Sequence, residues 1–154
     1  MRIPPRTATD AYLARTGKEL DIAFDVDLGE LIEGHHVVAR GIMFGHFEHE
    51  ESWTDNELHY EFVPAIGADA QGFGWYWMVY ASDDAGTEYN DYNGGAFDPE
   101  GTGPASHGTR DLGGLIPPDA TRLTLRFEPP DDWTPPESWR RQLEIDLRGH
   151  RLIG

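Results

Sequence analysis

Hydrophobic and polar residues alternate along most of the chain, which is the pattern of a β-strand with one buried face. In the clearest case, residues 19–28, the apolar positions Leu20, Ile22, Phe24, Val26 and Leu28 alternate with positions of which four are carboxylates. Successive side chains of a strand point to opposite faces, so strict period two predicts a strand whose sheet has one side in water.

The same pattern predicts further strands at residues 36–47, 57–62, 73–82, 109–112, 122–127 and 142–148. The alternation slips at Arg40 and Gly41, where a β-bulge would restore it. Residues 73–82 have large side chains on both faces and predict a central strand. The turn at residues 83–86 then predicts a hairpin partner at residues 87–92, a Gly-rich loop at 93–108 and a stiff Pro-rich segment at 129–139.

Seven or eight short strands about ten residues apart, with turn signals between them, predict an all-β fold, an antiparallel β-sandwich of the immunoglobulin-like kind. A closed barrel is the alternative. Residues 1–17 differ from the rest and predict an N-terminal extension with a short helix, capped by Thr9 or Asp10 and ending at Gly17. Residues 18–154 are expected to form one sandwich domain.

Composition narrows the possible partners. With 154 residues the chain can bury a core without metal or disulfide staples. Twelve basic and 28 acidic residues give a net charge of −16, which opposes binding to nucleic acid and to anionic membrane. The absence of cysteine excludes disulfides and thiol chemistry. No apolar run suits a signal peptide or a membrane helix, so we expect a soluble, cytoplasmic protein.

Residues 80–127 carry a layout of turn motifs. An acidic hairpin followed by a tyrosine, DAGTEY at residues 84–89, precedes a Gly-rich loop, the segment IPPDA at 116–120 and the strand residues LTL at 123–125. This layout resembles immunoglobulin-like sandwich domains of uncharacterised bacterial proteins, including the lipoprotein-associated DUF4352 type and hypothetical actinobacterial proteins. The resemblance covers about a third of the chain and implies the fold only. The chain departs from the lipoprotein pattern in lacking a lipidation cysteine.

Two groups of residues have the chemistry of metal ligands. His46, His49 and His59 are of a type that binds zinc or nickel, and a hairpin over residues 46–59 would bring His46 near His59. Residues three apart on a strand point to opposite faces, so the spacing of His46 and His49 favours a polar hairpin tip in water over a metal site. An acidic loop offers oxygens of the kind that Ca²⁺ prefers, from Asp83, Asp84, Glu88 and Asp91. Asp and Asn also dominate turns for backbone reasons.

Aromatic residues are the third candidate group, because flat rings bury much area at small entropic cost. About half of the aromatic residues are expected to fill the core. The candidate binding residues are Trp75, Tyr76, Trp77, Tyr80, Tyr89, Tyr92 and Trp133.

The chain contains no nucleophile elbow, phosphate-binding loop or dinucleotide fingerprint. We therefore expect a non-enzymatic binding or interaction module without a cofactor, whose partner is another protein or a second copy. The contact is expected at the strand 75–80 or the Pro-rich residues 129–136. One alternative is a calcium-assisted carbohydrate-binding module at the acidic loop. Another is a metal-dependent hydrolase at the three histidines.

Overall fold

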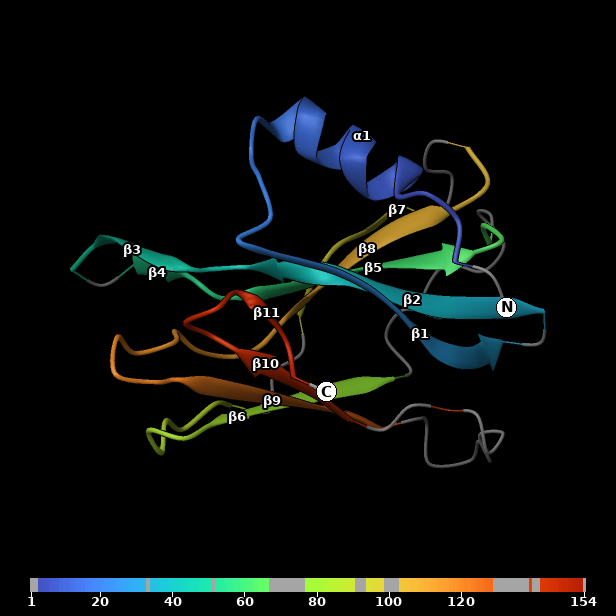
Figure 1. Ribbon diagram of the computed structural model, residues 1–154. Coiled ribbons are helices and arrows are strands. Elements are labelled where there is room, and N and C mark those ends of the chain that lie inside the picture. Colours follow the sequence, from blue (N-terminus) through green and yellow to red (C-terminus); the bar gives the residue numbers. More distant parts are fainter. Residues whose placement is uncertain are drawn as a thin grey trace.

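The computed structural model describes residues 3–32, 34–50, 52–66, 77–90, 94–98, 103–128, 139 and 142–153. Their strands form two antiparallel sheets that face each other, and a separate hairpin that extends beyond one end of them (Figure 1). The five-stranded sheet has the order β1-β2-β5-β8-β7, and the four-stranded sheet has the order β11-β10-β9-β6. The elements are α1 (Thr7–Thr16), β1 (Ile22–Ile32), β2 (His35–Met43), β3 (His46–His49), β4 (Ser52–Thr54), β5 (Glu57–Val63), β6 (Met78–Asp83), β7 (Phe97–Asp98), β8 (Ser106–Asp111), β9 (Arg122–Glu128), β10 (Gln142–Asp146) and β11 (Arg151–Leu152).

The predicted all-β sandwich is confirmed, and its core lies between the two sheets. The inward residues of β5 and β9 are fully or almost fully buried, among them Tyr60, Phe62, Leu125 and Phe127. Trp77, just before β6, is also fully buried, and its ring meets that of Tyr60 edge to face at 5.0 Å. Burial of this apolar area supplies the main driving force of folding.

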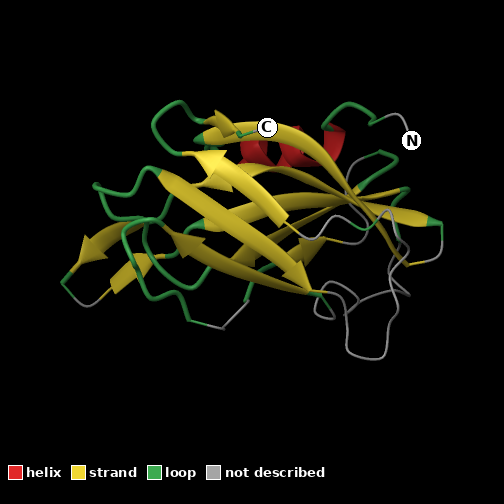
Figure 2. Cartoon of the chain, turned by 60° about the horizontal axis from the view of Figure 1, so that its bottom comes forward, coloured by secondary structure: helices red, strands yellow, loops and turns green. Residues whose placement is uncertain are grey.

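Helix α1 packs on the outer face of the five-stranded sheet, over β5 and β8 (Figure 1). It lies on the opposite side of the molecule from the four-stranded sheet, which comes forward in Figure 2. The helix ends at Gly17, as predicted, with that residue in the left-handed conformation at φ 70°. Its start differs from the prediction, because the helix begins at Thr7 and the residue before it, Arg6, gives no side-chain cap.

The predicted bulge lies in β2, where the register with β5 shifts between Ala39 and Gly41. The shift turns Arg40 to the outer face while Ala39 and Ile42 both join the core. A Cβ at Gly41 would overlap the carbonyl oxygen of Ile22, so the neighbouring strand requires glycine there.

Several predicted elements are wrong in extent or pairing. The predicted strand 36–47 is two strands, because β2 ends at Met43 and β3 begins at His46. The described part of the predicted partner strand 87–92 is loop, and β6 pairs with β9 instead. That places β6 at an edge of its sheet rather than in the centre.

Further differences concern the later strands. The predicted loop 93–108 contains β7 and the start of β8, and the predicted strand 142–148 ends at Asp146. The described residues hold eleven strands rather than seven or eight, because short strands such as β4, β7 and β11 leave no alternation to read. The Pro-rich segment, apart from Trp139, lies outside the described residues. Within the described part of the chain, no helix is long and apolar enough to cross a membrane.

Candidate functional site

The β3–β4 hairpin is the candidate binding element. Its strands pair Phe47 with Trp53 and His46 with Thr54 (Figure 1). At its base, the Gly45 N–H donates to Asn56 Oδ1 at 2.7 Å, and Asn56 Nδ2 donates to the Gly114 carbonyl at 2.8 Å. A Cβ at Gly45 would overlap the Thr54 carbonyl oxygen. Close backbone approach and the buried Asn56 therefore hold the base of the hairpin.

Two large aromatic side chains of the hairpin are in water. Phe47 is 69% exposed and Trp53 is 52% exposed. Their rings meet edge to face, with centroids 6.2 Å apart. Trp53 Nε1 donates to Asp55 Oδ1 at 2.9 Å, which fixes the orientation of the indole. Among the described residues only Ile153, at 36%, is a further exposed large hydrophobic. An exposed aromatic pair on a projecting strand pair is typical of a protein-contact surface.

A groove of about 260 Å³ lies at the base of this hairpin. Phe44 and Gly45 line it immediately before β3, and Asn56 lines it after β4. Its other lining residues are apolar, namely Ile116, Pro117, Pro118, Ala120 and Leu147. The hairpin therefore leaves the groove at the start of β3 and returns to it after β4.

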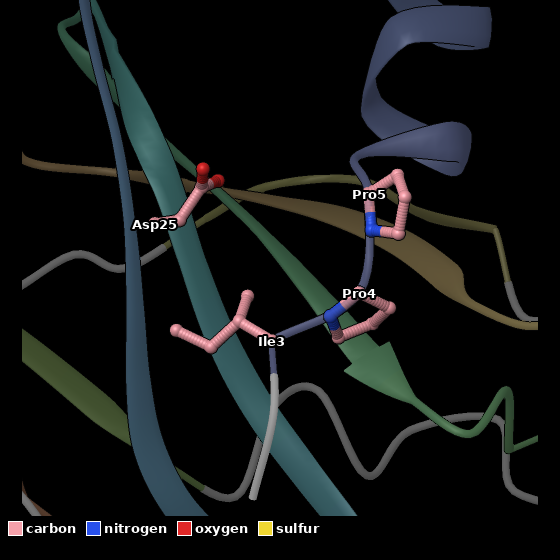
Figure 3. A pocket seen from close by; sticks show the side chains of 4 residues that line it. All are labelled: Ile3, Pro4, Pro5 and Asp25. Carbon is pink, nitrogen blue, oxygen red and sulfur yellow. The ribbon is translucent and has the colours of Figure 1, made fainter.

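A second pocket, of about 500 Å³, lies between the N-terminal segment and β1 (Figure 3). Ile3, Pro4, Pro5 and Asp25 line it. The Asp25 carboxylate accepts a hydrogen bond from Arg40 Nη1 at 2.9 Å. The charge at this pocket is therefore already paired with a guanidinium of the protein.

Of the predicted aromatic residues, Trp77 is a core side chain and unavailable to a surface partner. Tyr80 is half-buried under the guanidinium of Arg126, whose carbon lies 4.8 Å from the ring centroid. Tyr89 is half-buried and donates its hydroxyl to Asp83 Oδ2 at 2.8 Å. Burial and the Asp83 carboxylate raise the pKa of Tyr89. Four predicted residues lie outside the described residues: Trp75, Tyr76, Tyr92 and Trp133.

The carboxylates of the acidic loop hold the chain in place. Asp83 Oδ1 accepts hydrogen bonds from the N–H groups of Ala85 and Thr87, at 2.9 and 3.1 Å. Asp84 accepts from the N–H groups of Thr121, at 2.8 Å, and Arg122, and from the Thr121 hydroxyl.

The pKa values of the two aspartates reflect these bonds. The hydrogen bonds from the Thr121 side chain and backbone lower the pKa of Asp84 to about 2. Burial raises the pKa of Asp83, but the hydrogen bonds it accepts outweigh burial and the pKa is lowered. Glu88 is exposed, and Asp91 lies outside the described residues. The donors on Asp83 and Asp84 are those of a structural turn.

The structure does not bring the three predicted histidines together. His46 and His49 are exposed on β3, whereas His59 is fully buried on β5, beneath α1. Among the described residues, no group of three or more His, Asp and Glu side chains is arranged to hold a metal ion. The neighbours of His59 on β5, Leu58 and Tyr60, point into the core, so the alternation of a strand turns His59 to the outer face of the large sheet.

A buried polar cluster, which the sequence did not reveal, lies beneath α1. Arg40 and Glu61 are both fully buried, and Glu61 Oε2 accepts from Arg40 Nε at 3.0 Å and Nη2 at 2.7 Å. Arg40 Nη2 also donates to the Pro4 carbonyl at 3.0 Å. Glu61 Oε1 accepts from the Thr9 N–H at 2.8 Å, in the first turn of α1. A carboxylate of β5 therefore provides the cap that the helix lacks.

Two histidines form the other half of the contact with α1. His59 Nδ1 lies 3.1 Å from His107 Nε2, and the Tyr12 ring of α1 stacks on His107 with centroids 4.3 Å apart. Glu57 Oε2 lies 3.4 Å from His59 Nε2. Burial, then His59 and Arg15, lower the pKa of His107 to about 3, so the ring is neutral at pH 7.

Sequence reasoning missed Phe47 because β3 belongs to neither main sheet. The alternation of its residues therefore does not indicate which face is buried. The available signal was the Gly45 break followed by a short, acidic, aromatic-containing segment. It missed the Arg40–Glu61 pair because charged residues on alternate strand positions indicate a solvated face.

Comparison of the chain with protein-family models, with curated proteins and with solved structures gives no significant match. The resemblance to immunoglobulin-like bacterial domains therefore stays a prediction.

Proposed function

We propose that this protein is a protein-binding β-sandwich module that contacts its partner through the β3–β4 hairpin. The observation that carries the proposal is the exposed pair Phe47 and Trp53, at 69% and 52%. Large aromatic side chains dominate binding energy at protein interfaces, where they enter pockets that exclude water. The rest of the described surface offers no other exposed aromatic residue of this size.

The partner is a different protein rather than a second copy. Each chain carries a net charge of −16, so two copies repel each other. The hairpin itself adds to this repulsion, because it carries the exposed carboxylates Glu48 and Glu50. The same charge opposes nucleic acid and anionic lipid as ligands.

The proposal is tested with a library of random dodecapeptides displayed on phage. The library is first depleted on the double variant Phe47→Ser/Trp53→Ser and then selected on the wild-type protein. Enriched peptides are synthesised, and their Kd values for both proteins are measured by calorimetry. Loss of two anchoring aromatic side chains is expected to weaken binding by at least 2 kcal/mol, about 30-fold. The matched control Ile153→Ser removes an exposed apolar side chain elsewhere and is expected to bind as the wild type does.

Two results would contradict the proposal. One is the absence of any enriched peptide whose binding depends on Phe47 and Trp53. The other is a wild-type dimer, seen by sedimentation velocity at 150 mM NaCl, that the double variant converts to a monomer. That second result would show that the hairpin contacts another copy of this chain.

A further inference from the structure

Helix α1 is held on the five-stranded sheet by a small number of contacts (Figure 1). Of its ten residues only Ala8 and Thr9 are buried. The Thr9 N–H donates to Glu61 in the first half of the helix, and the Tyr12 ring stacks on His107 in the second half. Because the helix buries little apolar area, these two contacts contribute much of its attachment.

Detachment of α1 would leave the core of the sandwich in place. Leu58, Tyr60 and Phe62 of β5 belong to the core between the two sheets, on the face of β5 that points away from the helix. The side chains that α1 covers are polar, among them Arg40 and His59, and water would solvate them. Local opening of this kind requires less free energy than unfolding of the whole chain.

A histidine pair beneath α1 tolerates only a limited number of protons. His59 Nδ1 lies 3.1 Å from His107 Nε2, so one of these nitrogens donates a hydrogen and the other accepts it. If both rings were protonated, both nitrogens would be donors and two positive charges would face each other. The strand register, with His59 opposite Thr109 and His107 opposite Glu61, keeps the two backbones at a fixed separation. The rings can therefore move apart only outward, where α1 lies.

The charged groups around the pair make protonation of His107 unfavourable while α1 is in place. The titratable and charged groups on the surrounding strands and on the helix are Tyr12 and Arg15 of α1, Glu57 and Glu61 of β5, Asp111 of β8 and, opposite His107 in the register, Asp98 of β7. Glu57 lies 3.4 Å from His59 Nε2 and favours a positive charge on that ring. Arg15 opposes a positive charge on His107.

These interactions fix the direction of the pH dependence. Burial, followed by the charges of His59 and Arg15, lowers the pKa of His107 to about 3 while the helix covers it. In water the pKa of a histidine is near 6.5. The state with α1 detached therefore takes up a proton at a higher pH than the covered state, and a fall in pH below 6.5 favours detachment.

We propose that α1 is a pH-sensitive cover of the five-stranded sheet, which detaches on acidification while the two sheets stay folded. Proton uptake by the histidine pair removes the hydrogen bond beneath the helix, and the positive charge on His107 repels Arg15 of the helix itself. Detachment uncovers the polar outer face of β5 and β8. This behaviour involves none of the β3–β4 hairpin and does not rest on the proposed function.

Hydrogen exchange of the full chain tests the proposal. Deuterium uptake by peptides from α1, β5 and β9 is measured by mass spectrometry between pH 6 and pH 4 and corrected for the intrinsic exchange rate at each pH. In the wild type, the protection factor of the α1 amides is expected to fall roughly 70-fold over this range, as follows from pKa values of about 3 and 6.5 for covered and uncovered His107. It is also expected to stay at least tenfold below the protection factors of β5 and β9.

Two substitutions separate the titration from the contacts of the helix. His107→Gln keeps an amide that can hydrogen-bond to His59 but cannot take up a proton, so its α1 protection factor is expected to change less than about fivefold between pH 6 and pH 4. The loss of stacking on Tyr12 lowers that protection factor at every pH and leaves its pH dependence flat. The matched control His49→Gln changes an exposed histidine of β3 and is expected to show the fall of the wild type.

Three results would overturn the proposal. The first is an α1 protection factor in the wild type that is the same at pH 6 and pH 4. The second is equal protection of α1, β5 and β9, which would show that the helix leaves only when the whole chain unfolds. The third is a fall in His107→Gln as large as in the wild type. The first two results need only the wild-type protein, so they can refute the proposal even if His107→Gln does not fold.

Discussion

The buried pair Arg40–Glu61 can be broken one side at a time, and the effect on stability is large. Both side chains are fully buried, and Glu61 accepts two hydrogen bonds from Arg40 and one from the Thr9 N–H. Glu61→Leu leaves the guanidinium without its main counter-charge, and Arg40→Met does the same to the carboxylate. Removal of one partner of a buried ion pair costs about 3–5 kcal/mol, against a total stability of about 5–15 kcal/mol.

The double variant Arg40→Met/Glu61→Leu distinguishes the cost of one unpaired buried charge from the contribution of the intact ion pair. Replacement of both charges by apolar side chains is often close to neutral, so we expect most of the lost stability to return. What does not return is the cap on Thr9, about 1 kcal/mol. Urea unfolding at pH 7, followed by circular dichroism, measures the four free energies of unfolding of this cycle. Single variants within about 1 kcal/mol of the wild type, or a double variant as unstable as the sum of the singles, would refute this reasoning.

Two further predictions concern pH. Burial, Glu57 and Asp55 raise the pKa of Asp111 to about 6, so the charge of this side chain destabilises the fold above that pH. Asp111→Asn is therefore expected to raise Tm above pH 6, and the gain in Tm should shrink toward pH 4. A gain in Tm that grows on acidification would contradict this prediction. The effect of His107 on stability has the opposite pH dependence, because its pKa of about 3 in the folded state lies below the unfolded value near 6.5. As the pH falls, His107 takes up its proton in the unfolded chain before it does so in the folded chain. The contribution of neutral His107 to the free energy of unfolding is therefore complete above pH 6.5 and falls as the pH is lowered toward 3. His107→Asn, which loses its stacking on Tyr12, should be less stable at pH 7 but lose less stability on acidification; an unchanged slope between pH 6.5 and 4 would contradict the neutral state of His107.

The sequence predicted the parts of the fold that depend on neighbouring residues. Strict alternation located β5 and β9 almost to the residue, and the slip at Arg40 located the bulge. It could not choose strand partners, because pairing of β6 with β9 rather than with residues 87–92 joins segments about 40 residues apart. The local turn at Asp83 and Asp84 looked like a hairpin, but Asp84 bonds to Thr121 and Arg122 and so directs the chain toward β9.

The candidate site was less predictable than the fold. A residue belongs to the surface when no other segment packs over it. Alternation within a strand shows only that the two faces of that strand differ in polarity. Phe47 has the sequence context of an inward strand residue, yet β3 belongs to neither of the two facing sheets. Conversely, Glu61 and His59 read as solvated positions of β5 until α1 is placed over them. Both errors have the same cause: segments distant in sequence decide whether a side chain is exposed, and alternation within one strand does not show them.

The cap that Glu61 gives to Thr9 also orders events during synthesis on the ribosome. Helix α1 emerges before the strands that it packs on, but ten residues without a cap of their own make a marginal helix in water. Its cap is 52 residues further along the chain, and its stacking partner His107 is nearly a hundred residues away. A nascent chain that stops before β5 therefore carries an unfolded α1 segment, and the helix takes its final form only after β5 and β8 have been made.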